Sequence, residues 1–224
     1  MKYVSVAVDG PAGSGKSTIT KMVAKSLGFN YVDTGAMYRA LTYNFLSNGL
    51  DELEEEEIKE LLSKTDFKVE YVDGVQYVYV NDVEVSDKIR TAEVSKFTSL
   101  FAKSPAVRDF LIDTQRNLAN TNNIIMDGRD IASVVLPNAD VKIFLTASVE
   151  ERARRRVLDF KRQGIENVDF EKVKEDIKAR DWQDENRDIA PLIKVESATL
   201  IDTTSLTIDE VVEKMTELVK SVEK

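Results

Sequence analysis

The chain has 224 residues, of which 42% are apolar and 32% are charged, and it contains neither cysteine nor histidine. This composition excludes a disulfide scaffold, cysteine-based metal sites and global disorder, and it removes the commonest general base. The net charge of −9 argues against broad nucleic-acid binding. No apolar run approaches the roughly 18 residues of a membrane span, and no signal peptide precedes the first expected strand. We therefore expect a cytoplasmic protein with no membrane or nucleic-acid partner.

The first expected elements surround a glycine-rich segment. Residues 3–8 form a β-branched run suited to a buried parallel strand, and residues 18–27 have helical periodicity. The expected buried face of this helix consists of Ile19, Met22, Val23 and Leu27. Between strand and helix, the pattern G-x-x-x-x-G-K-[ST] is matched by Gly10, Pro11, Ala12, Gly13, Ser14, Gly15, Lys16 and Ser17.

That pattern predicts a site for a nucleoside triphosphate. Glycines let backbone N–H groups turn toward a phosphate, and the start of the helix at Thr18 adds its positive dipole end. Lys16 can reach the β- and γ-phosphates, and the Ser17 hydroxyl can ligate Mg²⁺. The alternative is a glycine-rich turn with a chance lysine, but the strand before it and the helix after it favour the phosphate loop.

The middle of the chain departs from strand–helix alternation. After a short strand at 29–33, Thr34 is placed to cap a helix from about residue 36 to residue 47. An acidic run at 54–57 predicts the first turn of another helix. Residues 66–86 alternate around turns at Asp73-Gly74 and Asn81-Asp82, which predicts a three-stranded antiparallel meander. Helices at about 91–102 and 105–119 should follow.

The remaining elements complete an α/β pattern. Strands are expected at 124–127, 141–145 and 198–201, and helices at about 149–162 and 169–186. Thr207 and Glu210 have the spacing of a capping box. The apolar stripe of this last helix consists of Ile208, Val211, Val212, Met215, Leu218, Val219 and Val222. The expected fold is a five-stranded parallel sheet with helices on both faces and the meander as an insert.

Two clusters of arginine lie on predicted helices. Arg152, Arg155 and Arg156 share one face, with Arg154 beside them. They are either a solvated basic face paired with Glu150 and Glu151 or cations that act on a transferring phosphate. The second cluster is Arg180, Asp184 and Arg187, on one face of a helix expected to end near Ala190-Pro191. Two arginines and a carboxylate suit a phosphate and a sugar hydroxyl.

A third cluster, Asp127-Gly128-Arg129-Asp130, ends a predicted strand. An acid at this place beside a phosphate loop commonly holds Mg²⁺, directly or through water, and Arg129 suits an anionic substrate. The alternative is an ordinary Asp-Gly turn with surface charges. Whether Asp33 or Asp127 supports the metal is left open.

Taken together, these segments resemble the bacterial cytidylate kinases over nearly the whole chain. The resemblance rests on residues 9–17, 33–39, 89–91, 127–130, 141–145, 180–181, 184–187 and 190–192. It implies one P-loop kinase domain of 1–224. Its parts would be a core (about 1–37, 120–148 and 190–224), a monophosphate-binding region with the meander (about 38–119) and a lid (about 149–189).

The resemblance also implies roles for individual residues. ATP would be bound by Gly10 to Thr18 with Arg155 and Arg156, and Mg²⁺ by Ser17. CMP would be bound by Asp33, Thr34, Arg39, Ser99, Arg108, Arg129, Asp130, Arg180, Asp184 and Arg187, of which Ser99, Arg108 and Asp130 read the cytosine. Lys16, Arg129 and Arg187 would be catalytic.

The chemistry of the acceptor agrees with these roles. Asp130 can accept a hydrogen bond from the amino group of cytosine, while Arg108 or Ser99 donates to its acceptors; uracil reverses the first two partners. A phosphate acceptor is largely ionised at pH 7, so no general base is required. We expect a monomeric (d)CMP kinase that uses ATP and Mg²⁺. The alternatives are a kinase of UMP or of a small hydroxyl metabolite, and a nucleotide-dependent switch, for which a guanine-reading N-K-x-D element is absent.

Overall fold

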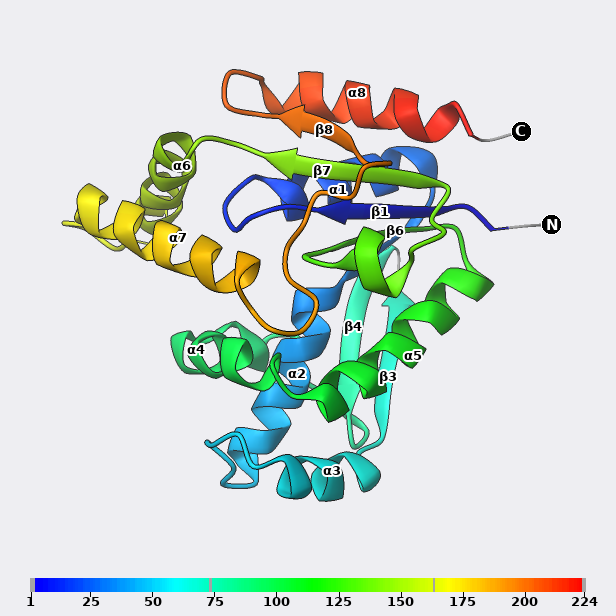
Figure 1. The fold of residues 1–224 in the computed structure, drawn as a ribbon, viewed down its shortest axis with the longest axis vertical. Coiled ribbons are helices and arrows are strands. Elements are labelled where there is room, and N and C mark those ends of the chain that lie inside the picture. The colour runs from blue at the N-terminus through cyan, green and yellow to red at the C-terminus, as the bar shows by residue number, and fades with distance from the viewer. Residues whose placement is uncertain (1–2, 73, 163, 223–224) are drawn as a thin grey trace.

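The computed structural model describes residues 3–72, 74–162 and 164–222, and its centre is a parallel sheet (Figure 1). The strands are β1 (Ser5–Asp9), β2 (Asn30–Asp33), β6 (Ile124–Gly128), β7 (Val141–Thr146) and β8 (Thr199–Asp202). Their order across the sheet is β2-β6-β1-β7-β8, and every neighbouring pair is parallel. The carboxyl ends of β2, β6 and β1 therefore lie together at one edge, where open parallel sheets place their ligands.

Helices cover both faces of this sheet, as predicted. On one face, α1 (Lys16–Leu27) and α8 (Ile208–Lys220) pack against side chains such as Val6, Val8 and Ile143. On the other, α2 (Thr34–Ser47) and α5 (Pro105–Thr121) pack against Ala7 and Met126. Successive residues of β1 alternate between the two cores because strand side chains point to opposite faces.

The predicted meander forms a separate sheet of β3 (Phe67–Val72), β4 (Val75–Val80) and β5 (Val83–Glu84), with antiparallel pairing. Asn81 and Asp82 both have positive φ, 51° and 61°, as a two-residue hairpin turn requires. Of the other predicted turn, Asp73 lies outside the described residues and Gly74 has φ of 75°. The flanking elements are α3 (Glu55–Ser63), the 3₁₀ turn η1 (Lys88–Arg90) and α4 (Ala92–Phe101).

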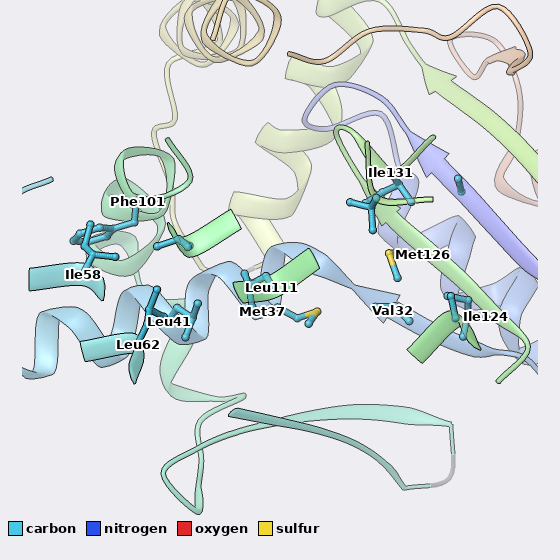
Figure 2. Packing of buried hydrophobic residues seen from close by; sticks show 14 of the residues in the cluster. Val32, Met37, Leu41, Ile58, Leu62, Phe101, Leu111, Ile124, Met126 and Ile131 are labelled. Atoms are coloured by element: carbon cyan, nitrogen blue, oxygen red, sulfur yellow. The ribbon is translucent and has the colours of Figure 1, made fainter. Parts of the chain in front are cut away.

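One hydrophobic core joins the parallel sheet to the inserted region. Figure 2 shows Val32 and Met126 at the sheet, Leu41 along α2, and Ile58 and Phe101 at the far end. The rings of Phe45 and Phe101 meet edge to face with centroids 4.9 Å apart. Because α2 runs through this core, it packs against both the parallel sheet and the inserted region, and these contacts fix the position of its N-terminus.

The predicted lid helices are α6 (Val149–Arg162) and α7 (Phe170–Glu185), which lie beside one another at the left of Figure 1. They share a small core of their own, made by Ala153, Val173 and Ile177. The helix predicted at about 169–186 is confirmed, since α7 ends at Glu185. The helix end near Ala190-Pro191, expected from the spacing of Arg180, Asp184 and Arg187, is wrong, and Arg187 lies in the irregular segment after α7. Within the described residues, every helix is too short or too polar to cross a lipid bilayer.

Four other local expectations were wrong. The cap of α2 is Asp33, whose carboxylate accepts from the Ala36 N–H at 2.8 Å, because Thr34 is itself the first helical residue. A π-helical turn, η2 (Ile131–Val135), follows β6 where no helix was expected. On α1, Met22 is 39% exposed, since the buried face turns toward Thr20 and Ala24 instead. The two ends of the stripe expected on the last helix are exposed: Ile208, the first residue of α8, is 51% exposed, and Val222, which lies past the end of α8 at Lys220, is 38% exposed.

The capping box of α8 gives a test of local stability. The Thr207 hydroxyl accepts from the Glu210 N–H at 3.3 Å, and the Glu210 carboxylate accepts from the Thr207 N–H at 2.8 Å. Thr207→Ala should lower the free energy of unfolding by about 1 kcal/mol in urea denaturation, since it removes one partner of a helix-terminal N–H. Glu213→Ala, at an exposed position of the same helix, is the matched control. Equal stability of the two variants would contradict a role for the cap.

Candidate functional site

The glycine-rich loop between β1 and α1 has the backbone of a phosphate loop. Gly10, Gly13 and Gly15 have φ of 148°, 76° and 89°, values that residues with a side chain rarely adopt. A Cβ on Gly10 would lie 1.9 Å from the Leu145 carbonyl oxygen, so this position has no room for a side chain. The Ser14 hydroxyl is buried and has no hydrogen-bond partner among the described residues, which leaves it free for a ligand.

Lys16 is folded back over this loop. Its Nζ donates to the carbonyl oxygens of Gly10 at 2.7 Å and Pro11 at 2.9 Å, and the side chain is buried. Burial and the positive charge of Arg129 lower the pKa of the Lys16 ammonium to about 7, against the opposing charges of Asp127 and Asp9. The ammonium is thus held at the centre of the loop with carbonyl oxygens in place of water, and an incoming anion would raise its pKa again.

Ser17 and Asp127 form an oxygen pair beside the loop. The Ser17 hydroxyl donates to Asp127 Oδ2 at 2.7 Å, and the Tyr31 hydroxyl donates to Asp127 Oδ1 at 3.2 Å. Burial, followed by the nearby charge of Asp33, raises the pKa of the Asp127 carboxyl to about 6. A buried carboxylate with a hydroxyl at hydrogen-bond distance is a donor set that suits a hard divalent cation. No group of three or more histidine, cysteine, aspartate or glutamate side chains placed to hold a metal ion occurs among the described residues.

The N-terminus of α2 adjoins this pair. Strand pairing sets Asp33 beside Asp127, and the Thr34 hydroxyl donates to the Asp127 carbonyl oxygen at 2.8 Å. Arg39, one turn into α2, donates to Asp33 Oδ2 at 3.1 Å. A Cβ on Gly128 would lie 2.9 Å from the Thr34 hydroxyl oxygen, which explains a glycine there. These contacts place Asp33 and Thr34, which were predicted to bind the acceptor, beside Asp127 of the Ser17–Asp127 oxygen pair.

The segment after β6 meets the end of the lid. Arg129 Nε donates to Asp184 Oδ2 at 2.7 Å. The buried Asp130 carboxylate pairs with Arg108 of α5 through one oxygen and lies 3.4 Å from Arg187 Nη2 through the other. Arg187 Nη2 is buried and makes no hydrogen bond within the described residues. Five of the predicted acceptor residues are therefore engaged in two ion-paired groups, Arg129 with Asp184 and Asp130 with Arg108 and Arg187.

Arg180 and Ser99 stand apart from these ion pairs. Arg180 lies at an exposed position of α7, yet the pKa of its guanidinium is lowered, first by desolvation and then by the charge of Arg129. The charges of Arg156 and Arg39 also lower this pKa. The charges of three other arginines therefore act on Arg180, which indicates that positive charge gathers in this region, as an anion site requires. Ser99 is exposed on α4, and no hydrogen bond in the described part of the chain joins it to Arg108 or Asp130.

The arginines of α6 divide between the two interpretations. Arg154 is exposed and bonds only Glu151, in keeping with a solvated face, and Arg156 lies over the Phe160 ring, 4.6 Å from its centroid. Arg155 donates to the Ser14 carbonyl oxygen of the glycine-rich loop at 3.3 Å. It also donates to the Thr203 carbonyl oxygen, just after β8, at 2.7 Å. Arg152 is buried and donates to Ala12 O at 3.0 Å and to Asp181 Oδ2 at 2.6 Å. Two arginines therefore join the lid helices to the loop.

Comparison with known proteins agrees with this geometry. Residues 6–221 match the family described as cytidylate kinase. The chain belongs to the cytidylate kinase family. A cytidylate kinase of Caldicellulosiruptor bescii is 47% identical over 224 residues, which cover 100% of this chain and 99% of that protein. One of Alkaliphilus oremlandii is 48% identical over 222 residues, covering 99% and 100%.

The likeness extends to solved structures at the level of the fold. The crystal structure of an uncharacterized protein from Eubacterium ventriosum has a TM-score of 0.52 at 12% identity, covering 97% of this chain and 99% of that chain. Such a low identity carries a similarity of fold and nothing more about the site.

Two site residues of this cytidylate kinase family member were not assigned a role from the sequence. Asp9, the last residue of β1, is buried and accepts from the N–H groups of Ile131 at 2.9 Å and Ala132 at 2.8 Å. Asp9 therefore connects β1, the strand before the glycine-rich loop, to η2, the turn that follows Asp130. Tyr31 is the second, through its bond to Asp127. The acid directly before Gly10 was a visible signal for Asp9, whereas Tyr31 has the pattern of any buried strand residue.

Asp9 makes the stability of the ligand-free protein depend on pH. Burial raises its pKa from 3.8 to about 6, so the fold favours the protonated carboxyl. This stabilisation is complete below about pH 4 and is lost as pH rises through about 6. Asp9→Asn cannot ionise and so does not lose this stabilisation. The free energy of unfolding of the variant minus that of wild type should therefore increase by roughly 2–3 kcal/mol between about pH 4 and pH 7.

Urea denaturation of both proteins at several pH values measures this gain. Asp51→Asn, at an exposed aspartate, controls for the change of residue type. A difference between Asp9→Asn and wild type that stays constant with pH would show that burial does not shift the Asp9 carboxyl.

Proposed function

We propose that this chain transfers the γ-phosphoryl group of ATP to CMP or dCMP, giving CDP or dCDP and ADP. The observation that carries the choice of acceptor is the buried Asp130 carboxylate, held between Arg108 and Arg187. A carboxylate accepts from the amino group of cytosine, and a guanidinium beside it donates to the ring nitrogen or carbonyl oxygen. Uracil would place an oxygen against that carboxylate, so the site selects cytosine.

The phosphate of the acceptor would be held by Arg39 and Arg129 with the Thr34 hydroxyl. Both arginines face carboxylates, Asp33 and Asp184, that keep their guanidinium groups oriented. Arg180, Asp184 and Arg187 would serve the sugar and the neighbouring phosphate. Ser99 is proposed as an additional contact of the base.

The donor would lie on the loop from Gly10 to Thr18. The inward-turned backbone, the free Ser14 hydroxyl and the Lys16 ammonium support binding of the β- and γ-phosphates. Ser17, with Asp127 beside it, would hold Mg²⁺, and Asp33 contributes to the negative charge there. When bound, the ion neutralises charge on the donor phosphates. Arg155 and Arg156 of α6 would complete the donor site.

Catalysis in this site is positioning and charge stabilisation. The acceptor oxygen belongs to a phosphate whose second pKa is about 6, so it is largely ionised at pH 7 and attacks without a general base. This is consistent with a chain that has no histidine. Lys16 stabilises charge that develops on the transferring group, and Arg129 and Arg187 approach it from the acceptor side. The dry surroundings of Lys16 strengthen this interaction.

A coupled assay of ADP release with CMP, dCMP, UMP and AMP as acceptors tests the proposal. Wild type should prefer CMP and dCMP, and Asp130→Asn should reduce the ratio of kcat/KM for CMP to that for UMP by about tenfold or more, because an amide can also donate to uracil. Asp113→Asn, on the same helix as Arg108 but outside this network, is the control. A wild-type preference for UMP would overturn the assignment of Asp130.

Replacement of Lys16 separates catalysis from folding. Lys16→Ala should lose several kcal/mol of transition-state stabilisation, a fall in kcat/KM of at least about a thousandfold, because it removes the cation held at the Gly10 and Pro11 carbonyl oxygens. Its thermal midpoint should stay close to that of wild type, since the change removes a desolvated charge. A purified variant with near-normal turnover would disprove the mechanism.

A further inference from the structure

Gln76 of β4 contacts the site from the inserted meander. Its side-chain Oε1 accepts from the Asp33 N–H at 2.7 Å, and its Nε2 donates to the Asp33 carbonyl oxygen at 3.3 Å. Both groups belong to one residue, the last of β2. We infer that Gln76 is a positioning residue for the acceptor phosphate, acting through Asp33 on Arg39. The inference rests on the proposed role of Arg39 in binding CMP.

The place of β2 in the sheet explains why such a partner is required. In the part of the chain that the structure describes, β2 pairs with β6 alone and is an edge strand, so the outward N–H and C=O of its residues have no strand beside them. A primary amide reproduces the donor and acceptor that a neighbouring strand would offer. Gln76 therefore completes the hydrogen bonding of β2 at its carboxyl end, where the site begins.

The Asp33 side chain carries this constraint forward. Oδ1 accepts from the Ala36 N–H at 2.8 Å and so caps α2, while Oδ2 accepts from Arg39 Nη2 at 3.1 Å. The space is tight, because a Cβ on Gly35 would lie 3.0 Å from Arg39 Nη1 and 3.2 Å from Asp33 Oδ1. A rotation of the Asp33 peptide would consequently turn both the cap and the guanidinium.

The meander provides a firm base for Gln76. Val78 and Val80, further along β4, are buried at 1% and 5% exposure and pack with Ala36 and Ala40 of α2. Gln76 itself lies opposite Tyr71 of β3 in the antiparallel register. The amide is thus held by a sheet that is packed on the same helix whose N-terminus it helps to set. A change of this amide should therefore affect the acceptor, while the donor loop keeps its geometry.

The test compares Gln76→Met, which keeps the length of the side chain but removes both hydrogen bonds, with wild type. Val75→Thr, at an exposed position of the same strand, is the matched control. Gln76→Met should raise KM for CMP and the calorimetric Kd for CMP by about tenfold, with kcat and KM for ATP within about twofold of wild type. Gln76→Thr, which suits a strand but is too short to reach Asp33, should behave in the same way if the methionine variant does not fold.

The outcomes separate this inference from the proposed function. If wild type binds CMP and the Gln76 variants bind it equally well, the positioning role is wrong. If the variants lose affinity for ATP and CMP alike while their thermal midpoint falls, Gln76 is structural and the inference is again wrong. If wild type neither binds nor phosphorylates CMP, the proposed function fails first, and calorimetry on wild type shows this independently of any variant.

Discussion

The placement of three aspartates at the carboxyl ends of adjacent parallel strands, two of them buried, is the constraint on which the site depends. Asp9 and Asp33 end β1 and β2, Asp127 is the residue before the last of β6, and register sets Asp33 beside Asp127; Asp9 and Asp127 are buried and Asp33 is partly buried. Removing carboxylates from water is costly unless each finds donors. Asp9 finds two backbone amides of η2, Asp33 finds the start of α2, and Asp127 finds the hydroxyls of Ser17 and Tyr31. The loops at this edge are arranged by those donors.

Regular elements were predictable because their patterns are local. The sheet, its flanking helices and the meander follow from periodicity and turn residues that lie within a few positions of each other. Their ends were less predictable, because Asp33 and Thr34 are both good caps and only the position of β2 decides between them. The π-helical turn after Asp130 depends on a tertiary contact that no local pattern encodes, because its first two N–H groups donate to Asp9 of β1.

The same distinction applies to the site. Contiguous motifs identified Lys16, Ser17 and the residues 127–130, and the structure brings these near Arg39, Arg108, Asp184 and Arg187. Contacts between residues that are far apart in the chain have no comparable signal in the sequence. Gln76 is one polar residue in a strand, 43 positions from Asp33, and Tyr31 has the pattern of a core residue. For Ser99 the structure adds no contact with the base site, so its role remains a prediction.

Three of the arginines proposed to bind the acceptor are already engaged in ion pairs. Arg39 faces Asp33, Arg129 faces Asp184, and Arg187 faces Asp130. An anionic substrate that binds them as proposed would therefore enter by exchange, displacing internal carboxylates from their cations instead of occupying unpaired positive charge. Exchange lowers the net gain from each contact, because every new ion pair replaces an old one. It also makes departure easy, since the internal carboxylates re-form their pairs as the product leaves. An enzyme that binds and releases nucleotides at each turnover benefits from such a balance between capture and release.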